Sequence, residues 1–267
     1  MVNILIFSKN RAAQLELLLR SIKEFFTDWL DFKFNILYTY GTNEYERSYE
    51  ILKKIHPEFN YILETDFKAQ IVSIIDPEMP YTLFFVDDNV FKEPFTFRSD
   101  LLKKFKAREN ISCISLRLYP GIIYCYPMRI PSPPPEFIED WTWACSGTIG
   151  DWNYRMSLDG HIFRTSDIYE SIRRLPYKNP NSFESLMSFN PIPKPYMTCF
   201  GLSPIFNIPV NKVQTFNNNY CGNMGADTLN NIFLNGQGIS LTNIRHIKNI
   251  SCHQEIEFVF ESRRHPA

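Results

Sequence analysis

The sequence lacks two features that would assign it to a class at once: a long apolar run and an excess of charge of one sign. No stretch of its 267 residues approaches the roughly 18 to 20 uninterrupted apolar residues that cross a bilayer, so we expect no transmembrane segment. Lysine and arginine total 28 against 29 for aspartate and glutamate, a formal net charge of −1. A nucleic-acid partner would require a basic excess, so we expect none.

Cysteine pairs and a targeting segment are missing as well. The six cysteines are scattered, without a CxxC pair or a spacing typical of zinc sites, which favours free thiols in a reducing compartment. The first residues run directly into an apolar segment without a basic stretch before it, so we expect no signal peptide. These patterns favour a cytoplasmic protein, and peripheral association with a membrane stays open.

The first ninety residues alternate between strand and helix patterns. Short apolar runs predict strands over 3–8, 34–39, 61–63 and 81–86. Apolar residues three and four apart predict helices between them, the first with Asn10 as its N-cap and the others over 45–55 and 67–75. This alternation with short connections is typical of an α/β fold, a mostly parallel sheet covered by helices on both faces.

The pattern changes after residue 100. We expect helices over 101–108, 167–175, 182–189 and 228–234, strands over 111–118 and 160–164, and an extended proline-rich loop over 127–135. No flexible linker interrupts the chain, so we expect a single domain over 1–267. Its first hundred residues form the ordered α/β half, and residues 101–267 form a second half that ends in an irregular segment.

The most informative motif is Asp87-Asp88-Asn89, directly after the apolar run 81–86. Ligands bind outside the carboxyl ends of the strands in open parallel sheets, so these side chains stand where chemistry is expected. Clustered carboxylates are hard oxygen ligands suited to Mg²⁺ or Mn²⁺, which could bridge two phosphates of a nucleotide. The alternative is that Asp87 and Asp88 only cap the next turn.

Two segments resemble a known family. Residues 3–22, a strand followed by a polar loop with Asn10-Arg11 and a helix, resemble the opening of the family-2 glycosyltransferases. The Asp87-Asp88 motif about seventy residues later resembles their DXD-type metal site. The similarity covers residues 1–95 and, less closely, 145–190. It implies a GT-A-like three-layer fold and metal-dependent transfer of a sugar from a UDP- or GDP-sugar to the hydroxyl of a glycan or other acceptor, with inversion.

The resemblance also implies a nucleotide-sugar pocket. By position it would contain Ser8, Lys9, Asn10, Arg11, Tyr40, Asp66, Lys68 and Asp87. The family usually has acidic residues after its second strand, and this chain departs from that pattern with Tyr40-Gly41-Thr42-Asn43. The alternative for the loop 8–11 is that it only caps a helix, and the alternative for Lys68 is a solvated charge at a helix start.

An inverting transferase needs a general base for the acceptor hydroxyl. The family places a carboxylate near the start of a helix that follows a glycine-containing strand, and Glu184 after the strand 160–164 resembles it. The alternative is a capping box, with Asn181 as N-cap and Glu184 at the third helical position.

Histidine and tryptophan supply the remaining candidates. GT-A enzymes often recruit a late histidine as a metal ligand, which implies His253, or His246, beside Asp87, Asp88 and Asn89. On the acceptor side we expect His161, in the strand 160–164, and Trp152, whose ring could stack on a sugar. Core packing is the alternative for the tryptophans, and a packed or exposed histidine is the alternative for each histidine.

Two other functions stay open. A sugar-phosphate nucleotidylyltransferase would use a similar sheet and Mg²⁺, but we would expect a glycine-rich basic loop after its first strand, and the loop 8–11 contains no glycine. A catalytically silent binding protein could keep the same fold.

Overall fold

The computed structural model of the chain describes residues 2–211, 222 and 224–263. Its centre is one eight-stranded sheet that takes strands from both halves of the sequence. Strand β10 is antiparallel to both of its neighbours and β9 is antiparallel to β11, whereas the other pairings are parallel. In spatial order the strands are β3 (Asn60–Leu63), β2 (Phe34–Thr39), β1 (Val2–Lys9), β4 (Tyr81–Val86), β10 (His161–Arg164), β6 (Ile111–Ser115), β11 (Tyr196–Cys199) and β9 (Thr142–Ala144).

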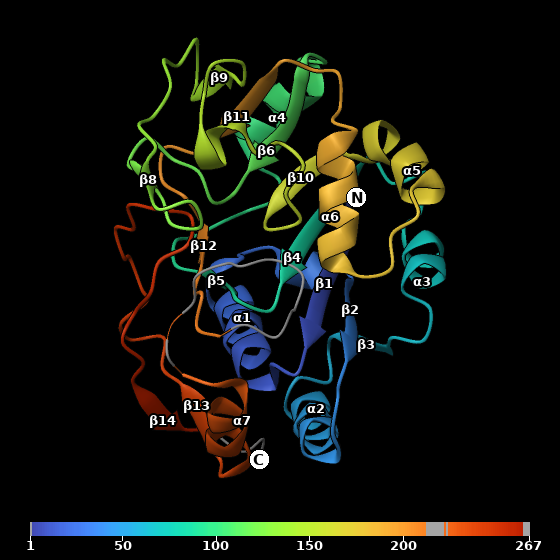
Figure 1. The fold of residues 1–267 in the computed structure, drawn as a ribbon, viewed down its shortest axis with the longest axis vertical. Helices are drawn as coiled ribbons and strands as arrows, with labels where there is room; N and C mark the ends of the chain where they lie inside the picture. Colours follow the sequence, from blue (N-terminus) through green and yellow to red (C-terminus); the bar gives the residue numbers. More distant parts are fainter. Residues whose placement is uncertain (1, 212–221, 223, 264–267) are drawn as a thin grey trace.

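Helices cover both faces of this sheet, so the predicted α/β class with a mostly parallel sheet in three layers is confirmed. One face packs on α1 (Ala12–Phe25), α2 (Asn43–Ile55), α4 (Asp100–Ala107) and α7 (Ala226–Leu234). The other face packs on α3 (Phe67–Ile74), α5 (Thr165–Arg174) and α6 (Pro180–Phe189), which Figure 1 shows grouped on one side of the sheet.

The two faces of β1 belong to two different hydrophobic cores. Ile4 and Ile6 pack with the α1 face, while Leu5 and Phe7 pack with the α3 face. Successive side chains of a strand point to opposite faces, so a strand buried on both faces has to be apolar throughout. This is why β1 and β4 are continuous apolar runs, and why the polar residues that follow them stand out.

In the described part of the chain, three short strand pairs lie outside the central sheet. They are β5 (Asn89–Phe91) with β12 (Ile205–Asn207), β7 (Tyr124–Cys125) with β8 (Ile130–Pro131), and β13 (Gln237–Ile239) with β14 (Phe260–Ser262). In the first pair Asn207 stands opposite Asn89, which brings residues from late in the chain beside the Asp87-Asp88-Asn89 motif.

The structure corrects three expectations about local structure. The second half is less irregular than predicted, because β9 and β11 extend the central sheet. The strand 111–118 ends at Ser115. The N-cap of α1 is Arg11, whereas Asn10 has a positive φ of 57° and its Oδ1 accepts a hydrogen bond from the backbone N–H of Gly41 at 2.8 Å.

The thiol and membrane expectations concern features of the whole chain. Five cysteines are buried and free, as predicted, and the sixth, Cys221, lies outside the described residues. In the part of the chain that the structure describes, no helix has both the length and the apolar character needed to span a bilayer. The described residues also form two short 3₁₀ turns, Trp29–Asp31 and Gly150–Asn153.

Candidate active site

A cavity of about 400 Å³ lies where the chain leaves the carboxyl ends of β1 and β4. This edge of a parallel sheet is the usual location of ligand sites in α/β folds. Loops from distant parts of the sequence complete the wall. The polar residues that line the cavity are Arg11, Asp88, Arg117, Tyr126, Asp151, Tyr154, Asp159, Asn181, Glu184, Asn207, Asn211 and His253.

The carboxylate of Asp87 is held by the loop after β1. Its Oδ1 accepts a hydrogen bond from Nη1 of Arg11 at 3.1 Å, and its Oδ2 accepts from Ser8 Oγ at 2.9 Å and from the backbone N–H of Lys9 at 3.1 Å. Burial raises the pKa of Asp87 to about 6, although the charge of Arg11 acts against this shift. Asp87 therefore ties the ends of β1 and β4 together.

Asp88 and Asn89 differ from Asp87 in their surroundings. Asp88 lines the cavity, where one oxygen lies 3.3 Å from Nη1 of Arg11 and the other accepts from Nδ2 of Asn207 at 2.9 Å. Burial raises the pKa of Asp88, and Arg11 opposes the rise. Asn89 is buried, and its Oδ1 accepts from the backbone N–H of Val86 at 2.9 Å. Of the three motif residues, Asp88 is the one in the cavity wall.

Glu184 reaches the same cavity from the first turns of α6. Its Oε1 accepts from Ser157 Oγ at 3.1 Å and from the backbone N–H of Leu158 at 2.9 Å. Burial raises the pKa of Glu184 to about 7, and the nearby charge of Asp159 contributes in the same direction. A carboxyl group with a pKa near neutrality is suited to accept a proton at physiological pH.

The capping-box alternative for Glu184 is wrong. The helix begins at Pro180, and its capping box joins Asn179 to Ser182. The side chain of Asn179 accepts from the backbone N–H of Ser182 at 2.9 Å, and Ser182 Oγ accepts in return from the backbone N–H of Asn179 at 3.1 Å. Glu184 takes no part in this cap, so its carboxylate is free to face the loop 157–159.

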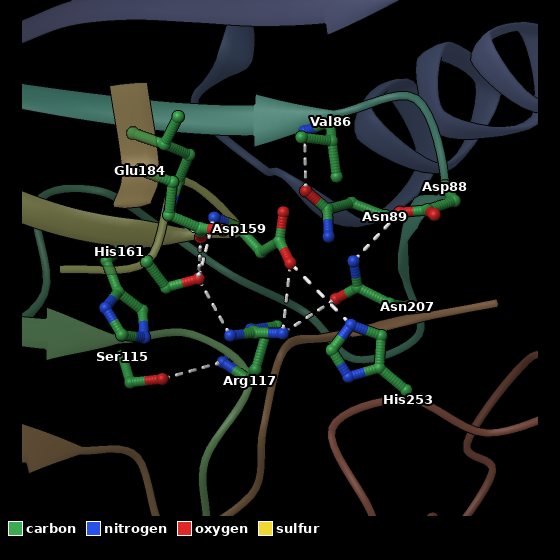
Figure 2. Close-up of polar contacts among 12 residues, drawn as sticks. Val86, Asp88, Asn89, Ser115, Arg117, Asp159, His161, Glu184, Asn207 and His253 are labelled. Carbon is green, nitrogen blue, oxygen red and sulfur yellow. Dashed lines mark hydrogen bonds and ion pairs between the residues drawn. The ribbon is translucent and has the colours of Figure 1, made fainter. Parts of the chain in front are cut away.

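A buried arginine that was not predicted from sequence, Arg117, also lines the cavity. Figure 2 shows the guanidinium of Arg117 between Asp159 and Asn207. Its Nη1 lies 3.2 Å from Oδ2 of Asp159 and 3.4 Å from Oδ1 of Asn207, and its Nη2 donates to Ser157 Oγ at 2.9 Å. His253 contacts the same carboxylate, with Nε2 at 3.7 Å from Oδ2 of Asp159.

These residues were missed because the chain positions that meet here are far apart. Arg117 and Asp159 are separated by 42 residues, and Arg117 and Asn207 by 90. One local signal existed: Arg117 lies two residues beyond the strand at 111–115, and Asp87 directly follows the strand at 81–86. A charged residue at the end of a buried strand marks the same edge of the sheet in both cases.

Several residues predicted for the nucleotide pocket lie elsewhere. Tyr40 donates to Oε1 of Glu46 at 2.6 Å, Asp66 is the N-cap of α3, and Lys68 lies over the ring of Tyr177 at 5.7 Å. None of these three predicted residues lines the cavity in the part of the chain that the structure describes. Arg11 and Asp88 do line the cavity. Ser8 and Lys9 are not among the described lining residues; they donate hydrogen bonds to Asp87 instead.

The two residues predicted for the acceptor side are buried. His161 is 1% exposed; its Nδ1 lies 3.2 Å from the backbone oxygen of Arg155, and burial lowers its pKa to about 3. Trp152 is 0% exposed, packs edge-on against Trp143 at 5.0 Å, and donates from Nε1 to the backbone oxygen of Ser132 at 3.2 Å. Trp152 thus has a packing position, with no open ring face for a sugar.

Of the residues predicted as cation ligands, Asp88 and His253 line the cavity. Among the described residues, no three histidine, cysteine, aspartate or glutamate side chains are grouped as a metal site. Asp87 and Asn89 use their oxygens within the protein. Nδ1 of His253 is buried without a hydrogen-bond partner. His246 is exposed and lies 3.0 Å from Glu93.

The chain is similar to the bifunctional glycosyltransferase pgtA of Dictyostelium discoideum, a curated protein. The two are 25% identical over 287 residues of alignment, which includes 90% of this chain and 36% of pgtA. The chain therefore spans about a third of the length of its relative. No family model matches the sequence. The predicted similarity to glycosyltransferases is confirmed across most of the chain, while membership of family 2 stays a prediction.

Solved structures with a related arrangement are more distant. Staphylococcus aureus TarS is 14% identical, with 77% of this chain and 36% of TarS covered and a TM-score of 0.46. The mannosyltransferase PcManGT of Pyrobaculum calidifontis, in complex with GDP-Man and Mn²⁺, is 10% identical, with 74% and 54% covered and a TM-score of 0.38. A cytidylyltransferase of Leptospira borgpetersenii is 13% identical, with 71% of each chain covered and a TM-score of 0.38. Likeness at this level concerns the fold alone.

Proposed function

We propose that this chain is a glycosyltransferase that moves a sugar from a UDP- or GDP-sugar to the hydroxyl group of a glycan or another acceptor. The observation that carries the proposal is the meeting of Asp88 and Glu184 in one cavity at the carboxyl ends of the central strands. The similarity to pgtA over 90% of the chain supports the same class of reaction.

The donor would lie on the side of the cavity formed by the first hundred residues. Arg11, in the loop after β1, presents a guanidinium beside Asp88, which suits the phosphates of a nucleotide sugar. Asp87 would hold this loop in place by accepting hydrogen bonds from Ser8, Lys9 and Arg11. The second half, residues 101–267, would supply the acceptor side, including Glu184.

A divalent cation fits the residues of the cavity. Asp88 offers a carboxylate oxygen and His253 lines the same cavity, so we propose these two as the protein ligands of Mn²⁺ or Mg²⁺. Cations of this kind often bind through one or two protein groups together with substrate phosphates and water. When bound, the cation would neutralise the charge of the nucleoside diphosphate that leaves.

Glu184 would act as the general base. The acceptor hydroxyl loses its proton to the carboxylate of Glu184 while its oxygen forms a bond to the anomeric carbon, and the bond from that carbon to the diphosphate breaks. This single displacement inverts the configuration at the anomeric carbon. The two hydrogen bonds on Oε1 from Ser157 and Leu158 hold the carboxylate in place, and its pKa of about 7 allows it to take up and release the proton.

Calorimetric titration with UDP, GDP and CDP and with their common sugar conjugates, each with and without Mn²⁺, tests the proposal. We expect binding of at least one sugar nucleotide that Mn²⁺ strengthens. Slow release of free sugar from the bound donor would report the transfer chemistry with water as acceptor. Failure of the wild type to bind any of these nucleotides would overturn the proposal.

The same preparation separates the nucleotidylyltransferase alternative. A nucleotidylyltransferase incubated with a nucleoside triphosphate and a sugar phosphate would release pyrophosphate. A glycosyltransferase would release no detectable pyrophosphate under the same conditions. A protein that binds a sugar nucleotide tightly but neither hydrolyses nor transfers its sugar would support the silent binding protein.

A further inference from the structure

We propose, on the basis of the function above, that Arg117 is a positioning residue that fixes the hydrogen-bond direction at both ends of the cavity. Its side chain is 2% exposed, so it contacts the surrounding protein and not the solvent. Two chains of hydrogen bonds begin at its guanidinium, and we call them the two arms. One runs through Ser157 to Glu184 and the other through Asn207 to Asp88 (Figure 2).

The first arm runs through Ser157. A guanidinium carries donors and no acceptor, so Nη2 of Arg117 donates to Ser157 Oγ at 2.9 Å. The backbone N–H of Asp159 also donates to this oxygen, at 3.2 Å. With its oxygen occupied as an acceptor, the hydroxyl group of Ser157 directs its own proton to Oε1 of Glu184 at 3.1 Å. This donation favours the ionised form of Glu184, the form that can accept a proton.

The second arm runs through Asn207. Nη1 of Arg117 lies 3.4 Å from Oδ1 of Asn207, which fixes the side-chain amide with its oxygen toward the arginine. The other end of the amide, Nδ2, then points to Oδ1 of Asp88 and donates to it at 2.9 Å. An amide without this contact could turn over and present its oxygen to the carboxylate of Asp88.

Other charged groups also act on Arg117 and on Glu184. Burial alone would lower the pKa of Arg117, but Asp159 and, with smaller effects, Cys252, Asp151 and Glu184 act in the opposite direction, so the guanidinium stays protonated. Glu184 is faced by Asp159, Arg117 and Tyr154. Asp159 opposes the ionisation of Glu184, and Arg117 favours it both through its charge and through Ser157.

The arginine fork explains why one residue can serve both arms. The two terminal nitrogens of a guanidinium point in fixed, different directions, whereas a lysine brings a single nitrogen. A lysine at this position would keep the positive charge and lose the simultaneous contact with Ser157 and Asn207. Arg117→Lys therefore separates the effect of the charge from the effect of the geometry.

Two substrate-free NMR measurements test the proposal. The first follows the pH titration of the Glu184 side-chain carboxyl carbon, and the second follows the exchange of the Asn207 side-chain amide protons with solvent. For Arg117→Met we expect the Glu184 pKa to rise by about one unit or more and the Asn207 protons to exchange about tenfold faster. Ser157→Ala should change the first readout alone, because it cuts only one arm. Arg117→Lys should shift the pKa less than Arg117→Met and still accelerate the amide exchange.

The proposal is overturned if Arg117→Met leaves either readout at the wild-type value. Should Arg117→Met fail to fold, Arg117→Lys and Ser157→Ala decide the question in the same two measurements. Neither measurement needs a substrate, so absence of glycosyl transfer by the wild type would refute the proposed function and leave the result for Arg117 standing. Where a donor is turned over, Arg117→Met should move the pH profile of kcat/KM to higher pH by the same shift as the Glu184 pKa.

Discussion

Nη1 of Arg11 lies 3.1 Å from Oδ1 of Asp87, so the first carboxylate of the most conspicuous motif in the sequence is already paired within the protein. The same nitrogen lies 3.3 Å from Oδ2 of Asp88. The shared contact makes two adjacent aspartates unequal, because Asp87 is enclosed by backbone and side-chain donors and Asp88 borders the cavity. The first prediction follows from this difference.

Asp87→Asn should mainly lower stability, whereas Asp88→Asn should mainly weaken donor binding. Asp87→Asn replaces one of the two oxygens that accept from Arg11, Ser8 and Lys9 with an amide group that cannot accept, so we expect the free energy of unfolding to fall by about 1 to 3 kcal/mol in chemical denaturation. Asp88→Asn should change stability less and abolish the Mn²⁺-dependent part of sugar-nucleotide binding in calorimetry. Equal Mn²⁺ dependence in wild type and Asp88→Asn would exclude Asp88 as a metal ligand.

Glu184→Gln should remove transfer and leave donor binding intact. The glutamine amide oxygen can still accept from Ser157 and Leu158, but it cannot take up the acceptor proton, so we expect turnover to fall by about 10² to 10⁴-fold. Steady-state kinetics and donor titration measure the two effects separately. Glu170→Gln, on the exposed side of α5, is the matched control and should retain full turnover. Full activity in Glu184→Gln would show that another group is the base.

The raised pKa of Glu184 also implies that the stability of the protein depends on pH. The pKa of Glu184 is raised from 4.5 to about 7 in the folded protein, so between these values the folded state binds more protons than the unfolded state. Its contribution therefore favours folding at low pH and is lost as the pH rises from 4.5 to 7, by about 3 kcal/mol at most. Denaturation of wild type and Glu184→Gln across this range should show a difference that grows with pH in favour of the variant. A constant difference would contradict the raised pKa.

Gly160→Ala should destabilise the fold more than Gly147→Ala. Both glycines have a positive φ, 64° and 83°, and an alanine pays a similar backbone strain of about 1 to 2 kcal/mol at either position. A Cβ at Gly160 would also lie 2.1 Å from Cδ1 of Ile205, whereas a Cβ at Gly147 would have no atom within 4 Å. We expect an additional loss of about 1 to 3 kcal/mol for Gly160→Ala in thermal or chemical unfolding. Equal losses would mean that Ile205 can move aside freely.

Trp152→Ala tests whether this ring packs or binds. The ring is 0% exposed, so we expect a loss of about 3 to 5 kcal/mol in the free energy of unfolding. Trp141→Ala is the control, because that ring is 44% exposed and its removal should cost much less. If Trp152→Ala were as stable as the wild type and changed only acceptor affinity, the stacking role predicted from sequence would be restored.

The parts of the fold that could be predicted from sequence have local causes. The strands at 34–39 and 81–86 coincide with β2 and β4, because continuous apolar runs between polar turns need no knowledge of their neighbours. The carboxylates after residue 86 could be located for the same reason. By contrast, β11 directly follows Pro191, Pro193 and Pro195, a proline-rich pattern that predicts an irregular segment, so this strand was missed.

Residues of the cavity that depend on chain topology could not be predicted. Asp159 belongs to the site because β10 lies antiparallel between β4 and β6, an arrangement that no local pattern encodes. Asp66 and Lys68 illustrate the reverse error. Their order in the chain matches the resemblance, but they lie around α3, away from the cavity lining.

The position of β10 has a consequence for the order in which the chain folds during synthesis. The first four strands can pair as soon as residue 86 has been made, but the edge of β4 waits about 75 residues for β10. Until then an apolar strand edge is open to pairing with another chain, the usual starting point of aggregation. We expect fragments that end before residue 160 to aggregate more readily than the full chain, because they lack the strand that covers this edge of β4.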